Sequence, residues 1–146
     1  MSKAHGAPAK RSLHKARLVL ASASPQRSKI LGDAGFQFEA IDPGEVENAI
    51  AAAPTPDALA IAKARAKAME VAARLAPPFP AIVVGVDTLV AIDDEVIGKP
   101  LDRFDATGIL TRLSGTRHRV ISGLCLWTVH SKTEPGNVPQ GPAPTL

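Results

Sequence analysis

The chain has 146 residues, of which 45% are hydrophobic and 21% charged, which is typical of one soluble domain with a buried core. No stretch of the sequence is apolar enough to span a bilayer, and the single cysteine excludes an internal disulfide framework and suits a reducing cytoplasm. The formal net charge is +3, and residues 1–17 carry five lysines and arginines and no acid.

The basic segment at the N-terminus has two interpretations. A cluster of cations can touch nucleic acid or a membrane surface. Proteins that bind single-stranded nucleic acid place aromatic side chains among their cations, and this segment has none. We therefore expect a disordered leader over 1–16 and neither a membrane nor a nucleic-acid partner. Nucleic-acid binding through 1–17 stays open as an alternative.

The predicted elements alternate between strands and helices. Apolar, β-branched runs indicate strands, and Ala-, Lys- and Leu-rich runs behind a capping residue indicate helices. In chain order they are a strand at 17–21, a helix from Ser24 to 32–35, a strand at 36–41, a helix at 57–75, a strand at 81–92 that turns back into 95–97, a helix at 102–113 and a strand at 119–129. This order predicts an α/β domain with a mixed β-sheet flanked by helices.

Three segments should be irregular: the leader, the Ala/Pro stretch at 51–56, and a tail over 131–146 that holds four prolines. The tail has almost no large apolar side chains and cannot offset its ordering entropy, so it should be disordered. The folded domain is therefore expected over 17–130. Within its 57–75 helix, the expected apolar stripe is Leu59, Ala62, Ala66 and Met69.

The first candidate site lies between a strand and a helix, at Ser22, Ser24, Gln26 and Arg27. A helix N-terminus offers free N–H groups and a positive dipole end, and hydroxyl and guanidinium groups add donors for phosphate oxygens. Plain N-capping by Ser24, with Arg27 on a solvated face, explains the same residues equally well.

The second candidate is Asp87, which stands in an apolar strand beside Thr88. A carboxylate buried in a sheet is costly unless it is paired, binds metal or borders a site, so function is favoured over a loop-capping role. Gly85, two residues earlier, allows another group to approach the backbone closely.

The remaining candidates are weaker by themselves. Lys99 stands on a turn before a proline and can reach a phosphate as a point charge, although an exposed turn lysine is commoner. Glu45 and Glu47 could join Asp87 around a divalent cation, although loop glutamates are usually solvated. His118 could be a general base or a structural histidine.

Five segments occur in an order and spacing that are more specific than any one of them. They are LVLASASPQRSKIL (18–31), FEAIDPGEVE (38–47), IAKARAKA (61–68), VVGVDTLVAIDDEVIGKP (83–100) and LSGTRHRVISG (113–123). Together they resemble the Maf family of nucleotide pyrophosphatases, which has an inosine-triphosphatase-like fold, from about residue 17 to 127.

The resemblance implies hydrolysis of a nucleoside triphosphate to a monophosphate and pyrophosphate, assisted by a divalent metal cation, Mg²⁺ or Mn²⁺. When the roles of the family's residues are transferred to the matching positions, the resemblance implies that Asp87 accepts the proton of the attacking water. It also implies that Glu47 lies with Asp87 near the metal and that Lys99 faces a phosphate. The residues expected to bind substrate are Ser22, Ser24, Gln26, Arg27, Arg65 and Thr88.

Some positions depart from the family pattern. Gln26 stands where the family commonly has a second arginine, and it can bond a base edge but supplies no charge. The family's helix lysine aligns best with Arg65, with Lys67 close by. Thr88, and Ser114-Gly115 followed by His118, resemble the branch that acts on dTTP and UTP.

The end of the chain departs most. Family members continue past 119–129 into a further segment, so we expect a C-terminally shortened domain whose apolar sheet edges are exposed and prone to aggregation. The resemblance also implies a nucleoside triphosphate as binding partner and a homodimer. The alternative function is an inactive remnant that binds a nucleotide or a protein partner without turnover.

Overall fold

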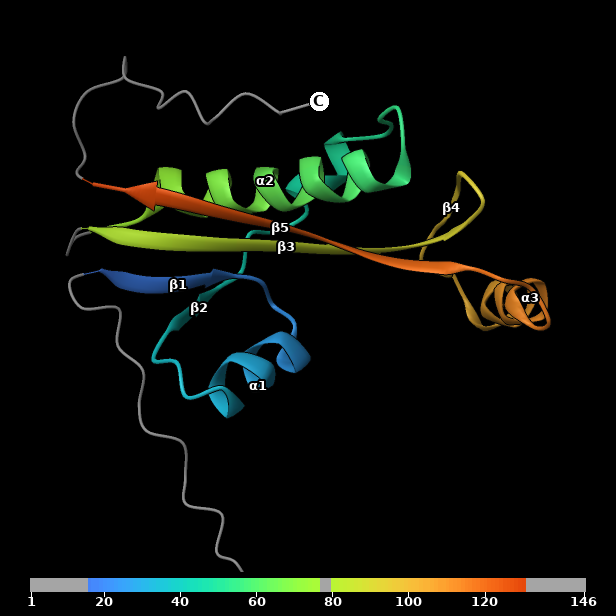
Figure 1. Ribbon diagram of the computed structural model, residues 1–146, viewed down its shortest axis with the longest axis horizontal. Coiled ribbons are helices and arrows are strands. Elements are labelled where there is room, and N and C mark those ends of the chain that lie inside the picture. The colour runs from blue at the N-terminus through green and yellow to red at the C-terminus, as the bar shows by residue number, and fades with distance from the viewer. Residues whose placement is uncertain (1–15, 77–79, 131–146) are drawn as a thin grey trace, which may run out of the picture.

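The structure is a computed structural model that describes residues 16–76 and 80–130, and within these ranges five strands form one mixed sheet flanked by three α-helices and a short 3-10 helix (Figure 1). The elements are β1 (Arg17–Ala21), α1 (Pro25–Asp33), β2 (Glu39–Ile41), η1 (Val46–Ala49), α2 (Pro56–Arg74), β3 (Ala81–Ile92), β4 (Glu95–Ile97), α3 (Arg103–Leu113) and β5 (Arg119–Val129). The predicted α/β class with a mixed sheet is confirmed.

β3 is the centre of the sheet. β1 pairs with its first five residues in parallel and carries β2, also parallel, on its far side. β5 runs antiparallel to β3 from Ala81 to Ala91, and β4 folds back onto the last three residues of β3. β3 is thus flanked by β1 only as far as Gly85, and beyond that point its side chains lie past the carboxyl end of β1.

The two faces of the sheet carry different helices. α2 lies along one face, over β3 and β5, and α1 lies on the other face beside β1 (Figure 1). The α2 face holds the larger buried cluster, built from Val19, Val71, Leu75 and Val83 with small residues between them. The α1 face holds a smaller cluster around Leu20.

Two glycines allow α2 to lie close to the sheet. A Cβ atom on Gly85 would lie 2.0 Å from the carbonyl oxygen of Ala64, and one on Gly123 would lie 2.2 Å from that of Ala60. These contacts leave no room for any side chain, which confirms the close approach expected at Gly85. The helix itself begins on a capping hydroxyl, since Thr55 Oγ1 accepts a 3.2 Å hydrogen bond from the backbone N–H of Ala58.

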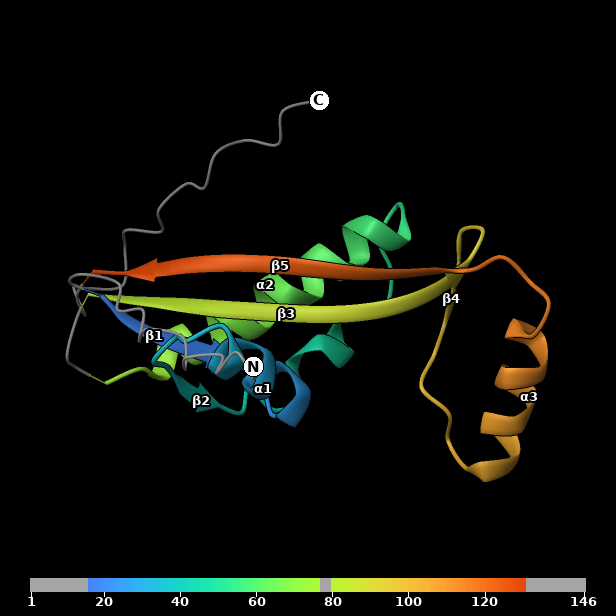
Figure 2. The ribbon, with the colours of Figure 1, turned by 60° about the horizontal axis from the view of Figure 1, so that its bottom comes forward.

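β4 and α3 extend from the far end of β3 and β5, away from the two main helices (Figure 2). No residue of α3 is buried, and Phe104 on its first turn is 89% exposed. α3 still begins as expected, because the Asp102 side chain accepts a 2.8 Å hydrogen bond from the N–H of Asp105.

Two sequence predictions need correction, and one short element was missed. The strand expected at 36–41 forms only at Glu39–Ile41, with an isolated bridge at Phe36. Phe36 and Phe38 alternate for another reason, because both pack against the α1-face cluster. The apolar stripe expected on α2 is right only at Leu59, which is buried. Met69 is 41% exposed, and the buried stripe runs on through Ala60, Ala64, Ala68 and Val71. The turn η1 was not predicted at all. The disorder predicted for 1–16 and 131–146 falls outside the described residues, apart from residue 16.

Candidate functional site

The candidate site lies where β3 continues past the end of β1. In open α/β sheets, ligands bind at the carboxyl ends of strands, where neighbouring loops diverge and leave a crevice. Here that crevice is a cavity of about 460 Å³ bordered by η1, the distal half of β3, β4 and α3. The polar side chains that line it are Glu47, Asn48, Lys63, Asp87, Thr88 and Lys99.

Three charged side chains meet at the inner end of this crevice, and we call them the carboxylate cluster: Glu47, Lys67 and Asp87. Lys67 Nζ lies 2.6 Å from Asp87 Oδ1 and 3.1 Å from Glu47 Oε1. All three side chains are at most 12% exposed. Two carboxylates therefore share one ammonium group in a desolvated environment, which leaves one negative charge in excess.

The cluster follows from the packing of three elements. Asp87 lies in the interior of β3, opposite Gly123 of β5, and points toward α2. Lys67 reaches it from the buried side of α2, where Gly85 permits close packing. Glu47 comes from η1, which packs against α2. Asp87 is thus a mid-strand buried carboxylate and not a strand-end cap.

Glu47 has an unusual balance of interactions. Burial by itself would raise the pKa of the Glu47 carboxyl, but its own backbone N–H, the hydrogen bond and charge of Lys67 and the charge of Lys99 together hold that pKa below its ordinary value. Glu47 therefore stays ionised. Its second oxygen, Oε2, is buried and has no hydrogen-bond partner among the described residues.

A second group of side chains, the hydroxyl–guanidinium chain, lies beside the first: Ser22, Arg27, Thr88 and Ser122. One Arg27 nitrogen donates to Ser22 Oγ at 3.0 Å, and the other donates to Thr88 Oγ1 at 3.4 Å. Thr88 Oγ1 lies 2.9 Å from Ser122 Oγ. Because Thr88 follows Asp87 directly, β3 joins the two groups while directing them to opposite faces of the sheet.

The N-terminus of α1 borders this chain. Ser24 is the N-cap and accepts from the N–H of Arg27 at 3.5 Å, and its own hydroxyl donates to Gln26 Oε1 at 2.9 Å. Ser22 Oγ accepts from the N–H of Ser24 at 3.2 Å. N-capping and phosphate binding, the two interpretations of this segment, are therefore compatible. Ser24 caps the helix, while Arg27 turns inward instead of into solvent.

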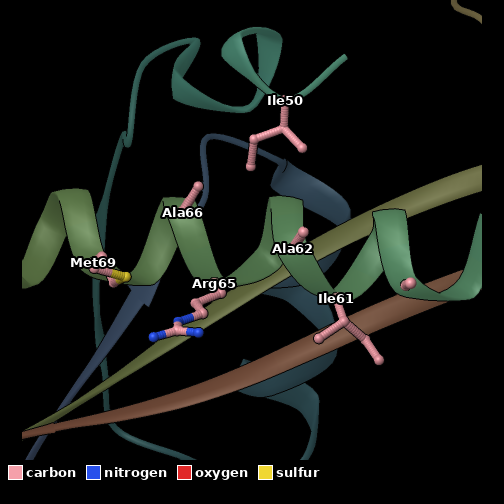
Figure 3. A pocket seen from close by; sticks show the side chains of 7 residues that line it. Ile50, Ile61, Ala62, Arg65, Ala66 and Met69 are labelled. Carbon is pink, nitrogen blue, oxygen red and sulfur yellow. The ribbon is translucent and has the colours of Figure 1, made fainter. Parts of the chain in front are cut away.

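The structure does not bring Arg65 to the site. Its guanidinium lies 5.8 Å from the ring centroid of Trp127, on the side of α2 that also carries Ala62 and Met69 (Figure 3). Lys67 contributes the helix cation instead, because two positions along an α-helix turn a side chain by about 200°. The resemblance aligned the helix cation best with Arg65 and named Lys67 only as its neighbour, although Lys67 stands at i+3 from Ala64 and i+4 before Val71, within the buried stripe.

The two remaining candidates, Lys99 and His118, lie at different places relative to the crevice. Lys99 is exposed in the loop after β4 and lines the crevice. His118 is exposed, with Nδ1 3.0 Å from the carbonyl oxygen of Thr116, and does not line the crevice. Ser122 was not predicted, because its only signal is its register opposite Thr88, which requires the β3–β5 pairing.

Fold and site together define a class: an α/β protein that presents buried carboxylates near clustered cations and hydroxyls at the carboxyl end of its parallel strands, as suits a phosphorylated ligand. The comparison with protein families agrees, because the model for Maf-like proteins matches residues 17–139. The chain belongs to the Maf family.

Individual relatives extend this result. The chain is 38% identical over 113 residues to a dTTP/UTP pyrophosphatase of Geotalea uraniireducens and 41% identical over 112 residues to one of Aquifex aeolicus; each match covers 77% of this chain and 56% of the relative. It is also 42% identical over 125 residues to a probable bifunctional dTTP/UTP pyrophosphatase/methyltransferase protein of Homo sapiens, covering 82% of this chain and 20% of that protein. The chain thus spans about half the length of the first two relatives. Among the described residues, no helix is long and apolar enough to cross a membrane.

Proposed function

We propose that this chain is a cytoplasmic nucleoside triphosphate pyrophosphatase that acts on dTTP and UTP or on modified nucleotides. The observation that carries the proposal is the carboxylate cluster, which is buried where β3 passes the end of β1, one residue along that strand from the hydroxyl–guanidinium chain. The names of the relatives, dTTP/UTP pyrophosphatases at 38% and 41% identity, support the same substrate class.

The cations and hydroxyls of the crevice suit a triphosphate. Arg27 can present two parallel donors to phosphate oxygens, and Lys99 on its exposed loop can add a point charge from the opposite side. Ser22 and Ser24 add hydroxyls beside the positive end of α1. These groups would hold the phosphate chain in place and offset charge that develops on the leaving pyrophosphate.

Asp87 is the residue that we assign to water activation. In the proposed reaction, a water oxygen bonds to the α-phosphorus, the bond from that phosphorus to the α–β bridging oxygen breaks, and pyrophosphate leaves. The water proton passes to the Asp87 carboxylate. Lys67 Nζ, 2.6 Å from Asp87 Oδ1, fixes the orientation of that carboxylate.

The residues present also fit a divalent metal cation, Mg²⁺ or Mn²⁺. The buried Glu47 Oε2 has no donor among the described residues, and a hard cation is the partner that such an oxygen accepts best. No group of three or more His, Cys, Asp or Glu ligands occurs in the described parts of the chain, so Glu47 and Asp87 would share such an ion with phosphate oxygens and water. A bound cation would neutralise part of the phosphate charge.

The test is pyrophosphate release by the purified chain with Mg²⁺ or Mn²⁺, measured for dTTP, UTP, CTP, GTP and modified nucleotides. We expect turnover on dTTP or UTP, and we expect Asp87→Asn to abolish it while the far-UV circular dichroism spectrum stays unchanged. Asp94→Asn is the matched control, since Asp94 is 91% exposed in the turn after β3 and should retain full activity.

Two outcomes would contradict the proposal. If Asp87→Asn turned over at the rate of the unsubstituted chain, the role given to Asp87 would be wrong. Nucleotide binding by calorimetry without any pyrophosphate release, from a folded sample, would instead establish the alternative of an inactive remnant.

A further inference from the structure

Lys63 is a cation of the crevice to which the proposed reaction gives no role. It stands in α2 four residues before Lys67, so the two side chains project from the same side of the helix, one turn apart. Lys67 is buried, whereas Lys63 is half-buried and lines the crevice together with Glu47 and Asp87. The helix therefore presents one buried and one accessible ammonium group to the same region.

The packing of α2 places Lys63 at the level of Asp87 along β3. Gly123 is the β5 residue that pairs with Asp87, and it lies directly against Ala60 of the helix. On β3, the glycine two residues before Asp87 lies against Ala64. The helical turn between these two contacts carries Lys63 and thus passes over Asp87. Because helical side chains tilt toward the start of their helix, Lys63 extends toward the distal part of β3, where the crevice lies.

The charges of the crevice suit an anionic ligand at Lys63. Lys67 is held by two carboxylates, whereas Lys63 takes part in none of the ion pairs formed within the described residues. The crevice and its inner cluster hold two carboxylates and three ammonium groups, those of Lys63, Lys67 and Lys99. With Lys63 the local balance is one positive charge, and without it the charges would cancel. A phosphate group is attracted to such a cleft.

We propose that the Lys63 ammonium group binds the α-phosphate, which is the phosphate bonded to the nucleoside. This inference rests on the proposed function, in which Asp87 activates the water that attacks the α-phosphorus. The phosphate next to Asp87 is then the α-phosphate, and the helical turn over Asp87 brings Lys63 to its non-bridging oxygens. Lysine acts there as a point charge with three rotatable donors and stabilises the charge on these oxygens as the water oxygen bonds.

Lys63 and Arg27 then serve different parts of the substrate. Arg27 reaches Thr88, which points to the opposite face of the sheet from Asp87. In phosphoryl transfer the attacking and leaving oxygens are roughly in line, so the leaving pyrophosphate lies on the far side of the α-phosphorus from the attacking water. Arg27 is placed for the pyrophosphate, and Lys63 for the α-phosphate that stays on the product.

Calorimetric titration of the full 146-residue chain with dTMP, and separately with inorganic pyrophosphate, tests this division in the presence of Mg²⁺. Lys63→Met removes the charge and keeps a similar side-chain length. We expect it to weaken dTMP binding about tenfold, while pyrophosphate binding stays within about twofold of the parent. Lys63→Arg keeps the charge and should bind dTMP more tightly than Lys63→Met does. Because Lys63 forms no ion pair within the described residues, the urea denaturation midpoints of both variants should match that of the parent.

Lys29→Met is the matched control, because Lys29 is an exposed lysine of α1 that pairs with Asp33 and does not line the crevice. It should bind both ligands as the parent does. Equal dTMP affinity of Lys63→Met and the parent, an equally large loss of pyrophosphate affinity, or no dTMP binding by the parent would each overturn the inference. Failure of the proposed function has a different signature, since the parent would then bind dTMP through Lys63 but release no pyrophosphate from any nucleoside triphosphate.

Discussion

Helices cover the two faces of the central sheet to different extents. The effect on polar side chains is seen at two neighbouring residues of β3. Asp87 points toward α2 and is 7% exposed, and it meets Lys67 at 2.6 Å. Thr88 points the other way, where α1 covers only β1, and it is exposed with a 3.4 Å contact to Arg27. Helix coverage therefore decides whether a polar group in this strand forms a buried ion pair or a solvated hydrogen bond.

The difference in helix coverage between the two faces has an energetic consequence. Desolvation strengthens the attraction within the carboxylate cluster, but it also makes the removal of one partner costly. On the α1 face, water can replace a lost hydrogen bond, so single changes there should cost little. The same lack of cover leaves Leu124 and Leu126 exposed on that face.

The largest expected effect comes from removing the shared cation. Lys67→Ala would leave the Glu47 and Asp87 carboxylates buried without a counter-ion, and we expect the free energy of unfolding to fall by about 3–5 kcal/mol. Arg65→Ala, on the other side of the same helix, removes a cation–π contact and should cost about 1 kcal/mol or less. Urea denaturation measures both. If the free energy of unfolding fell equally in the two variants, Lys67 would not be the buried counter-ion that distinguishes its side of α2 from the side of Arg65.

A smaller effect is expected where α2 approaches the sheet. Gly123→Ala would place a methyl group 2.2 Å from the Ala60 carbonyl oxygen and force the helix outward, which should cost about 1–3 kcal/mol. Gly108→Ala is the control, because nothing lies within 4 Å of its Cβ position in α3 and alanine should stabilise the helix by about 0.5–1 kcal/mol. Thermal unfolding distinguishes them. A Gly123→Ala variant as stable as the parent would show that α2 is not held this close.

The smallest expected effect concerns the pH dependence of stability. Folding lowers the pKa of Glu47 from its ordinary value of 4.5, so the ionised carboxylate stabilises the fold. That contribution is complete above the unfolded-state pKa and is lost as pH falls through the lower folded-state value. The stability difference between the parent chain and Glu47→Gln should therefore shrink on acidification below about 4.5. Denaturation midpoints from neutral to acid pH measure it, and a difference that stays constant would contradict the shift.

Most of the fold could be predicted from the sequence because its signals are local. Pro56 after the capping Thr55, and the β-branched run of β3, specify a helix start and a central strand without tertiary information. The short β2 and the turn η1 could not be predicted in this way. Three residues carry too little periodicity, and the phenylalanines before β2 alternate because they pack against the cluster around Leu20.

The candidate site was predictable in part. Asp87 stood out because a carboxylate in an apolar run requires a partner, and Arg27 because it follows a helix start. The partner of Asp87 did not stand out. α2 is so rich in alanine that apolar residues occur around its whole circumference, so the sequence did not show that Lys67, and not the better-aligned Arg65, lies on the buried side.

The sequence by itself determined the order of the elements, the family resemblance and the residue types available for chemistry, since each depends on short stretches of chain. Only the tertiary structure decided which of these residues meet. The packing of α2 against Gly85 and Gly123 selects Lys67 over Arg65, and the β3–β5 register places Ser122 beside Thr88.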